Sequence, residues 1–209
     1  MLKIWGKRSV ANVQKVLWCA GELGLPFEVP GDRPPLTQGR DGAYLAAKAT
    51  GSVPVIEDDG VVLWEGNAIA RYLAEKHGRG TLWPTDPVQR ADADRWMDYQ
   101  LSTVRVHIHP LMRETIDAKT VDFHSRALVE VMSPVEALLA TQPYLAGDRF
   151  TMGDIPVGIV TYRWFILNIE RPRMPNIEAW YQRLLARPAF VNNVIPPEDP
   201  NIGFRKGAA

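Results

Sequence analysis

The sequence predicts an α/β N-terminal half followed by an all-helical C-terminal half. Signals for β-strands are confined to residues 1–64, where short apolar runs alternate with helical patterns. From residue 88 onward, apolar residues recur only at helical spacing. A polar stretch with several glycines and prolines separates the two regions. We therefore expect a first domain of residues 1–78, a linker of residues 79–87 and a helical domain of residues 88–209.

The first domain is predicted to begin with a strand, a helix and a second strand. Leu2–Trp5 is a short apolar run that stops at Gly6, which indicates a buried strand. The helix that follows ends at Gly24, and its apolar face consists of Val13, Val16, Leu17, Ala20 and Leu23. Phe27–Val29 indicates the second strand, and such a βαβ unit has a right-handed crossover.

The rest of the first domain contains a hairpin between two predicted helices. Residues 43–48 suggest a short helix after a loop rich in proline, glycine and charge. Strands at Val53–Ile56 and Val61–Trp64 flank an Asp-Asp-Gly sequence, which is a hairpin signal. A helix then runs from about Gly66 to His77, so the predicted order is βαβ-α-ββ-α.

The second domain carries a series of helical patterns. Helices are predicted from Val88 to about Val106 and from His124 to Thr141. Pro134 lies inside the latter, and a kink or break is expected there, with a fresh helix start at Ser133-Pro134-Val135-Glu136. A last helix starts at Pro175 and ends at Arg187-Pro188, and the remainder is predicted to be an extended tail.

A sharper signal marks one helix start in the second domain. Thr151 is a suitable N-cap, and Asp154 stands three residues later, as in a capping box. Phe150 and Ile155 flank them as a hydrophobic staple. The helix behind this motif is expected to bury its apolar face, formed by Ile155, Ile159, Tyr162 and Ile166.

Composition excludes several classes of function. Lys and Arg together number 24, as do Asp and Glu, so the net charge is zero and no basic stripe favours nucleic acid. The single cysteine, Cys19, rules out an internal disulfide and suits a reducing compartment. No apolar run is long enough to span a membrane, and the N-terminus does not look like a signal peptide. The expected location is therefore the cytoplasm.

Four stretches together resemble the soluble glutathione transferase family, most closely its bacterial theta-like members. They are Asn12–Trp18, Val53–Ile56, Leu63–Ile69 and Phe150–Ile155. The resemblance implies an α/β thioredoxin-like N-terminal domain that binds glutathione as co-substrate, and an all-α C-terminal domain that shapes an acceptor pocket. It also implies a homodimer, and no metal cofactor.

The resemblance also assigns residues to glutathione. Val53-Pro54 matches the family's cis-proline, which would let the Val53 backbone pair with the cysteinyl backbone of glutathione; the local pattern alone favours an ordinary trans proline. Glu65 would take the γ-glutamyl ammonium, and the N–H of Gly66 its carboxylate. The family usually has serine at Gly66, so one hydrogen bond is lost, at a cost of about 1 kcal/mol. Candidates for the glycyl carboxylate are Lys48, Gln38 and Arg40.

The residue that would activate the glutathione thiol departs from the family pattern. In theta-like relatives a hydroxyl stands in the loop before the first helix, and its usual place here falls on Val10. Ser9 is one residue earlier, and Asn12, whose amide can donate a hydrogen bond, is two residues later. Our hypothesis is that Asn12 matters more than Ser9. The alternative is that one of them simply caps the helix.

The predicted activity is conjugation of the glutathione thiolate to a small, apolar electrophile. Two alternatives stay open: a glutathione-dependent disulfide reductase of the same fold, favoured by Asn12, and a non-catalytic glutathione-binding scaffold, favoured by Val10 and Gly66. The pair His107 and His109 lacks a nearby third ligand in sequence, which is poor evidence for metal. Both are assigned to the surface of the helical domain or to the acceptor pocket.

Overall fold

The computed structural model describes residues 1–33 and 51–196. The chain divides into two compact units. The first consists of Met1–Trp83 and a segment that starts at Pro188, and the second extends from Pro84 to Arg187. Within the described ranges, no helix has both the length and the apolar character needed to cross a bilayer.

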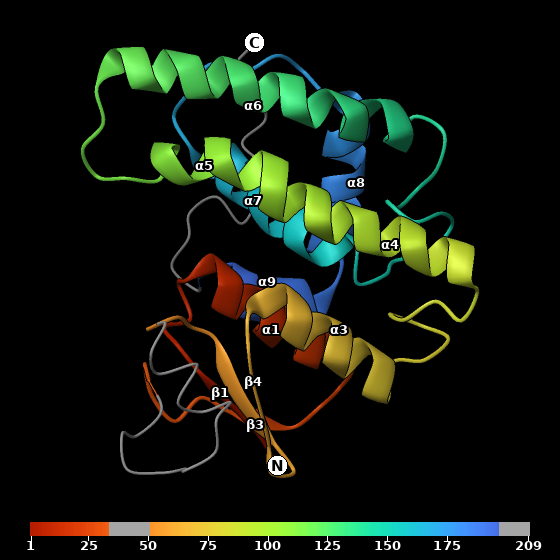
Figure 1. The fold of residues 1–209 in the computed structure, drawn as a ribbon. Helices are drawn as coiled ribbons and strands as arrows, with labels where there is room; N and C mark the ends of the chain where they lie inside the picture. The colour runs from red at the N-terminus through yellow and green to blue at the C-terminus, as the bar shows by residue number, and fades with distance from the viewer. Residues whose placement is uncertain (34–50, 197–209) are drawn as a thin grey trace. The chain divides into compact units, whose positions relative to one another are not determined.

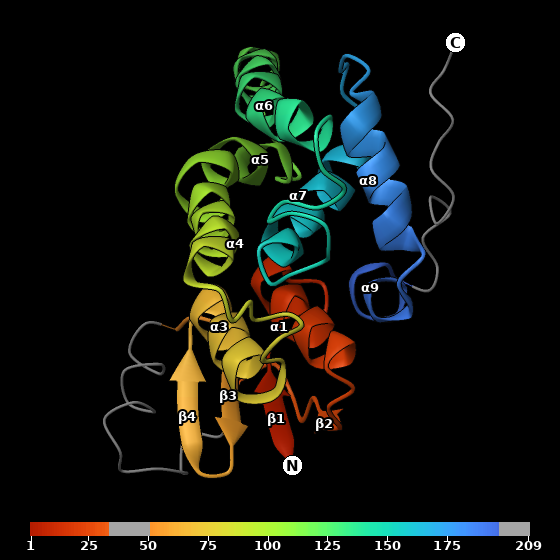
Figure 2. The same ribbon diagram turned by 90° about the vertical axis from the view of Figure 1, so that its right-hand side faces the viewer.

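A four-stranded mixed sheet forms the centre of the first unit. Its strand order is β2-β1-β3-β4, as Figure 2 shows. Strands β1 and β2 run parallel, and the β1–β3 and β3–β4 pairs are antiparallel. The strands are β1 (Leu2–Trp5), β2 (Phe27–Glu28), β3 (Val55–Asp58) and β4 (Val61–Trp64). This topology confirms the predicted βαβ unit and the hairpin that follows it.

The start of β3 differs from the prediction. The strand begins at Val55, two residues later than the sequence pattern suggested. The cis peptide bond between Val53 and Pro54 lies immediately before it, so these two residues approach the sheet without joining its ladder. At the other end, Asp59 and Gly60 turn the hairpin with positive φ angles of 49° and 84°, as a tight two-residue turn requires.

Two helices lie on one face of this sheet (Figures 1 and 2). Helix α1 covers Ala11–Glu22, and helix α3 covers Gly66–His77, the bounds that the sequence predicted for it. Their shared core contains fully buried apolar side chains: Val16, Leu17, Trp18, Ile69, Ala70 and Leu73. The short helix predicted at residues 43–48 lies outside the described residues.

Helix α9 (Pro188–Val194) also belongs to the first unit, although the sequence predicted an extended tail in the C-terminal domain. It packs against α1, where Trp18 and Phe190 have ring centroids 4.5 Å apart. The side-chain amide of Gln14 donates to the carbonyl of Val194 at 2.8 Å. The residues from 188 to 194 are therefore held by contacts with the start of the chain, which local sequence patterns do not contain.

The second unit is helical throughout its named elements. A long helical stretch consists of α4 (Pro87–Tyr99), a π-helical turn η1 (Gln100–Val104) and α5 (Arg105–Leu111). It is followed by α6 (Ala118–Leu139), α7 (Asp154–Ile166) and α8 (Pro175–Leu185). Helix α6 begins six residues before the predicted start because Asp117 caps it, accepting a hydrogen bond from the Thr120 N–H at 2.9 Å.

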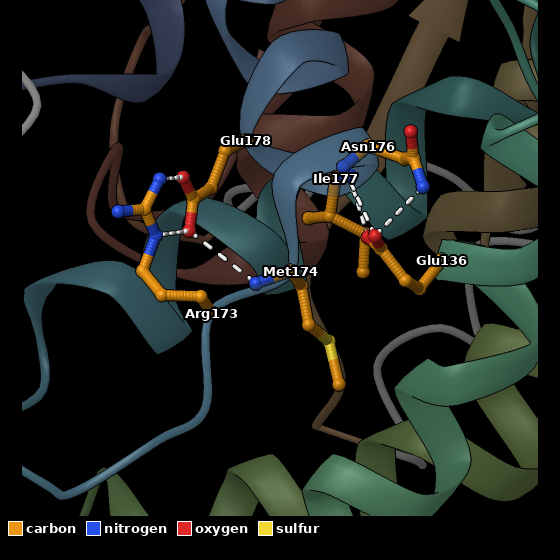
Figure 3. Close-up of polar contacts among 6 residues, drawn as sticks. All are labelled: Glu136, Arg173, Met174, Asn176, Ile177 and Glu178. Atoms are coloured by element: carbon orange, nitrogen blue, oxygen red, sulfur yellow. Dashed lines mark hydrogen bonds and ion pairs between the residues drawn. The ribbon is translucent and has the colours of Figure 1, made fainter.

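Helix α6 runs through Pro134 without the break that the sequence predicted. Glu136 does not serve as the first-turn acid of a new helix. Its carboxylate instead accepts the backbone N–H groups of Asn176 and Ile177, at 3.0 and 2.8 Å, and so caps the start of α8 (Figure 3). The function of Glu136 is therefore set by a helix 40 residues further along the chain.

The start of α7 is built around Asp154 rather than Thr151. The helix begins at Asp154, and the predicted N-cap Thr151 lies in the preceding turn, where its hydroxyl accepts the Gly153 N–H at 3.3 Å. The reciprocal half of the capping box is present, because the Asp154 carboxylate accepts the Thr151 N–H at 2.9 Å. Gly153 is required for packing, since a Cβ there would lie 2.7 Å from the carbonyl oxygen of Ala93 on α4.

Candidate functional site

Four of the residues predicted to bind glutathione lie in the first unit, just before β3 and at the start of α3: Val53, Pro54, Glu65 and Gly66. The Val53–Pro54 peptide bond is cis, which confirms the expectation drawn from the family resemblance. The β3–β4 ladder ends with Val55 opposite Trp64, so Val53 lies beyond its last pair. Val53 is partly exposed at that position, and Pro54 beside it is buried. The peptide groups just before β3 therefore have no partner strand in the β3–β4 ladder.

Glu65 connects β4 to α3 in an uncommon conformation. Its φ and ψ are 73° and 112°, a region that residues other than glycine rarely adopt. Such a conformation costs about 1–3 kcal/mol and persists where the surrounding structure enforces it, often at functional sites. The side chain is exposed and makes no capping hydrogen bond to α3, although Glu65 occupies the N-cap position. Its carboxylate is therefore available for a ligand at the start of the helix.

Gly66 and Asn12 are brought into contact, although 53 positions separate them in the sequence. A Cβ built on Gly66 would lie 2.9 Å from the backbone oxygen of Asn12 and 3.4 Å from its Cβ. The first turns of α1 and α3 thus approach each other at Gly66. The sequence interpreted this glycine only as the loss of a hydroxyl from the ligand site. The structure adds a packing reason, because the spacing of the two helices leaves no room for the side chain that would carry the hydroxyl.

Replacing Gly66 with serine is therefore expected to destabilise the protein, even though serine is the residue typical of the family. The new Cβ must displace a backbone atom of α1, and such overpacking costs about 1–3 kcal/mol. Gly31→Ser is a matched control, because a Cβ on Gly31 meets nothing within 4 Å. Urea unfolding of both variants measures the difference. Equal stability of the two variants would contradict this account of Gly66.

The start of α1 has no polar side chain at its N-cap. Val10 occupies that position, and its carbonyl accepts the first helical hydrogen bond, from the Gln14 N–H at 2.9 Å. Neither Ser9 nor Asn12 is the N-cap residue, so the alternative that one of them caps the helix is wrong. Asn12 occupies the second position of α1, partly exposed and against Gly66, whereas Ser9 is exposed in the preceding turn.

A buried polar pair supports this corner of the fold. The ammonium of Lys15 donates to the side-chain oxygen of Asn67 at 2.9 Å, and the two residues are only 2% and 5% exposed. Lys15 belongs to α1, and Asn67 directly follows Gly66 on α3. The hydrogen bond therefore joins the two helices next to the contact between Asn12 and Gly66. Sequence reasoning missed this pair, because Lys15 has the appearance of an ordinary surface residue.

Cys19 is a buried thiol with low reactivity. Its thiol is completely buried in α1, and burial, followed by the nearby charge of Glu22, raises its pKa to about 12. The Sγ atom donates to the carbonyl of Ala70 at 3.6 Å. A thiol in this state is inert.

Other predicted residues belong to the second unit or are not described. Gln38, Arg40 and Lys48 lie outside the described residues. His107 and His109 are both on α5, in the second unit. Both are partly exposed or exposed, as expected for the surface of the helical domain. The Nδ1 of His107 lies 3.2 Å from the Nδ1 of His124 on α6.

Comparison with known families agrees with the fold. A four-stranded mixed sheet with a cis-proline before β3, followed by a helical unit, defines a thioredoxin-like domain joined to an all-α domain. The family model "Glutathione S-transferase, N-terminal domain" matches residues 11–76, and "Glutathione S-transferase, C-terminal domain" matches residues 99–188. The chain therefore belongs to the glutathione S-transferase family.

Individual relatives cover nearly the whole chain. Glutathione S-transferase GstB of Escherichia coli K12 is 34% identical, over 94% of this chain and 99% of the relative. Glutathione S-transferase 3 of Zea mays is 31% identical, over 94% of this chain and 96% of the relative. The theta class enzyme of Xanthomonas axonopodis pv. citri, solved with glutathione bound, has a TM-score of 0.83 and 40% identity, over 93% of this chain and 97% of that one.

Proposed function

We propose that this protein transfers glutathione to a small, apolar electrophile through the glutathione thiolate. The observation that carries the proposal is the arrangement of Glu65, Gly66 and Asn12 at the meeting point of α1 and α3. The proposal is supported by family membership and by the similar Xanthomonas enzyme, whose structure contains glutathione.

Each part of glutathione is assigned to a group of matching chemistry. The backbone of Val53, next to Pro54, pairs with the cysteinyl backbone. The Glu65 carboxylate takes the γ-glutamyl ammonium, and the first N–H groups of α3, starting at Gly66, take the γ-glutamyl carboxylate. Lys48 and Gln38 are proposed for the glycyl carboxylate.

Thiol activation is assigned to the start of α1. A free thiol has a pKa of about 8.5, and lowering it by two units requires about 2.7 kcal/mol of preference for the thiolate. The Asn12 amide can supply about 1.5–3 kcal/mol through one hydrogen bond to the charged sulfur. Val10 has no side-chain group that could cap α1. The N–H groups of the first turn and the dipole of α1 can therefore also stabilise the thiolate.

The chemical step needs little from the protein beyond this activation. The thiolate sulfur attacks the electrophilic carbon, a carbon–sulfur bond forms, and the leaving group departs with the bonding electron pair. With a strained ring or an activated double bond, the electron pair stays on the acceptor and takes a proton from water. An apolar acceptor suits the concave, hydrophobic pockets in which small molecules usually bind.

The decisive experiment is a pH titration of bound glutathione, followed by thiolate absorbance. In the wild-type protein the thiol is expected to titrate at least one unit below its free value of about 8.5. Asn12→Ala should raise that pKa by about 1–2 units, because one charge-assisted hydrogen bond is removed. Ser9→Ala is the matched control and should leave it nearly unchanged. The reverse order, or binding with an unshifted thiol, would contradict the mechanism.

Disulfide reduction is a second candidate, favoured by Asn12 at the proposed thiol site. The inert Cys19 cannot contribute a thiol, so two glutathione molecules would reduce one disulfide and leave as oxidised glutathione. Parallel assays with an aryl halide and a mixed disulfide separate the two activities. Binding of glutathione without either activity would identify a scaffold instead.

We also propose that the protein acts in the cytoplasm as a homodimer. The proposal is supported by its membership of the family and by its single cysteine, which is buried and reduced. Sedimentation equilibrium tests the dimer directly, since a chain of 23.4 kDa would then have twice that mass.

A further inference from the structure

The second unit contains a pair of histidines that the proposed transferase reaction does not use. His107 lies on α5 and His124 on α6, and their Nδ1 atoms are 3.2 Å apart. Both side chains are partly exposed, with ring centroids 5.5 Å apart. The ring of Phe123, which is 62% exposed, lies beside both histidines. Two imidazoles from different helices therefore face each other through the same type of ring nitrogen, near the surface.

We propose that His107 and His124 form a binding site for a late first-row divalent metal ion, of the Zn²⁺, Ni²⁺ or Cu²⁺ type. Imidazole nitrogens bind zinc at about 2.0–2.1 Å in tetrahedral geometry, which places two ligand nitrogens about 3.3 Å apart. The observed separation of 3.2 Å is close to that value. An ion at about 2.0–2.1 Å from both nitrogens would lie beside the line that joins them, so both rings must turn about their side-chain bonds to bind it.

The hydrogen bond between the two rings must be replaced when an ion binds. At 3.2 Å, one neutral Nδ1 donates its hydrogen to the other, so only one of the two carries a proton there. Binding an ion requires that this hydrogen move to the Nε2 of the same ring, which releases no net proton. Burial and the nearby His124 lower the pKa of His107, while Glu130 acts in the opposite direction. A lowered pKa favours the neutral form of the His107 ring, which is the form that binds a metal ion.

The ligand set also determines the type of site. Among residues 1–33 and 51–196, no group of three or more His, Cys, Asp or Glu side chains is placed to hold a metal ion. The ion would thus have two protein ligands, and water would complete its coordination shell. Imidazole ligands favour Cu²⁺, Ni²⁺ and Zn²⁺ over Mg²⁺ and Ca²⁺, and affinity should be greatest for Cu²⁺.

Calorimetric titration of the metal-free, glutathione-free protein with Zn²⁺ and Cu²⁺ tests the proposal. We expect saturable binding of one ion per chain. His107→Gln and His124→Gln should each weaken it by about tenfold or more. His109→Gln is the matched control, because His109 lies on the same helix outside the pair, and it should bind like the wild type. The chain has four histidines, and His77→Gln serves as a second control at the remaining one.

The outcomes are distinguishable from those of the transferase proposal, because no glutathione is present. Circular dichroism of each variant confirms that the helices remain folded, so lost binding is assigned to the lost ligand. Proton NMR of the imidazoles should show the His107 and His124 signals shifting together on addition of Zn²⁺, with His109 unaffected. Absence of saturable binding, or equal weakening in His109→Gln, would mean that the two rings form a hydrogen bond and nothing more.

Discussion

Replacing Asp154 with alanine is expected to destabilise the protein by about 3–5 kcal/mol. The Asp154 carboxylate is completely buried and accepts the N–H groups of Leu145, Thr151 and Trp180 at 3.0, 2.9 and 3.1 Å. Removing it leaves these buried donors without that acceptor and opens a cavity at the start of α7. Urea unfolding measures the loss. Asp148→Asn, at a side chain 82% exposed, is the control and should change stability by less than about 0.5 kcal/mol.

The same carboxylate should make stability depend on pH in an unusual direction. Burial raises the pKa of Asp154 to about 6 from 3.8, although its hydrogen bonds favour the charged form. Between these two pH values the folded protein binds a proton that the unfolded chain has released. The free energy of unfolding therefore falls as pH rises from about 4 to 6, by about 3 kcal/mol from this residue.

Asp154→Asn isolates this contribution, because it removes the titrating group and nearly preserves the volume. The difference in stability between the wild type and Asp154→Asn should be largest at pH 4 and should shrink up to about pH 6. Comparing the two proteins at each pH cancels the effects of other carboxyl groups. These include Asp58, whose pKa is lowered by its hydrogen bonds to Lys76 and Tyr72, against the effect of burial. A difference that is constant with pH would show that Asp154 does not titrate in this range.

Replacing Glu65 with glutamine is expected to weaken glutathione binding by about 10- to 100-fold. The substitution keeps the shape of the side chain and removes the charge that would face the γ-glutamyl ammonium, an interaction worth about 1.5–3 kcal/mol. Calorimetric titration with glutathione gives the dissociation constants. Since the backbone conformation at Glu65 is uncommon, circular dichroism should first establish that the variant folds like the wild type.

The matched control for this prediction is Glu75→Gln, further along the same helix. Glu75 is exposed and forms a surface ion pair with Arg79 at 3.2 Å, so it should not affect the ligand. Unchanged affinity in Glu65→Gln, or an equal loss in both variants, would remove Glu65 from the proposed site. A loss confined to Glu65→Gln would support the assignment of the glutathione ammonium to this carboxylate.

The sequence by itself determined the features that local patterns encode. The hairpin between β3 and β4 follows from an Asp-Asp-Gly turn between apolar runs, and α3 begins and ends where its pattern indicates. The order of strands and helices, and the motifs at Val53, Glu65 and Asp154, were sufficient to indicate the family. These features depend on neighbouring residues, whose effects on the backbone are similar in any fold.

Only the tertiary structure decided how distant residues are used. Gly66 allows a close approach of α1, Glu136 caps α8, and α9 is held by α1. The partner of His107 is His124 rather than the neighbouring His109. Each of these depends on the distance between two helices, a quantity fixed by packing of the whole core. A glycine, a glutamate or a histidine has the same appearance in the sequence whichever helix lies opposite, so its partner becomes known only once the chain is folded.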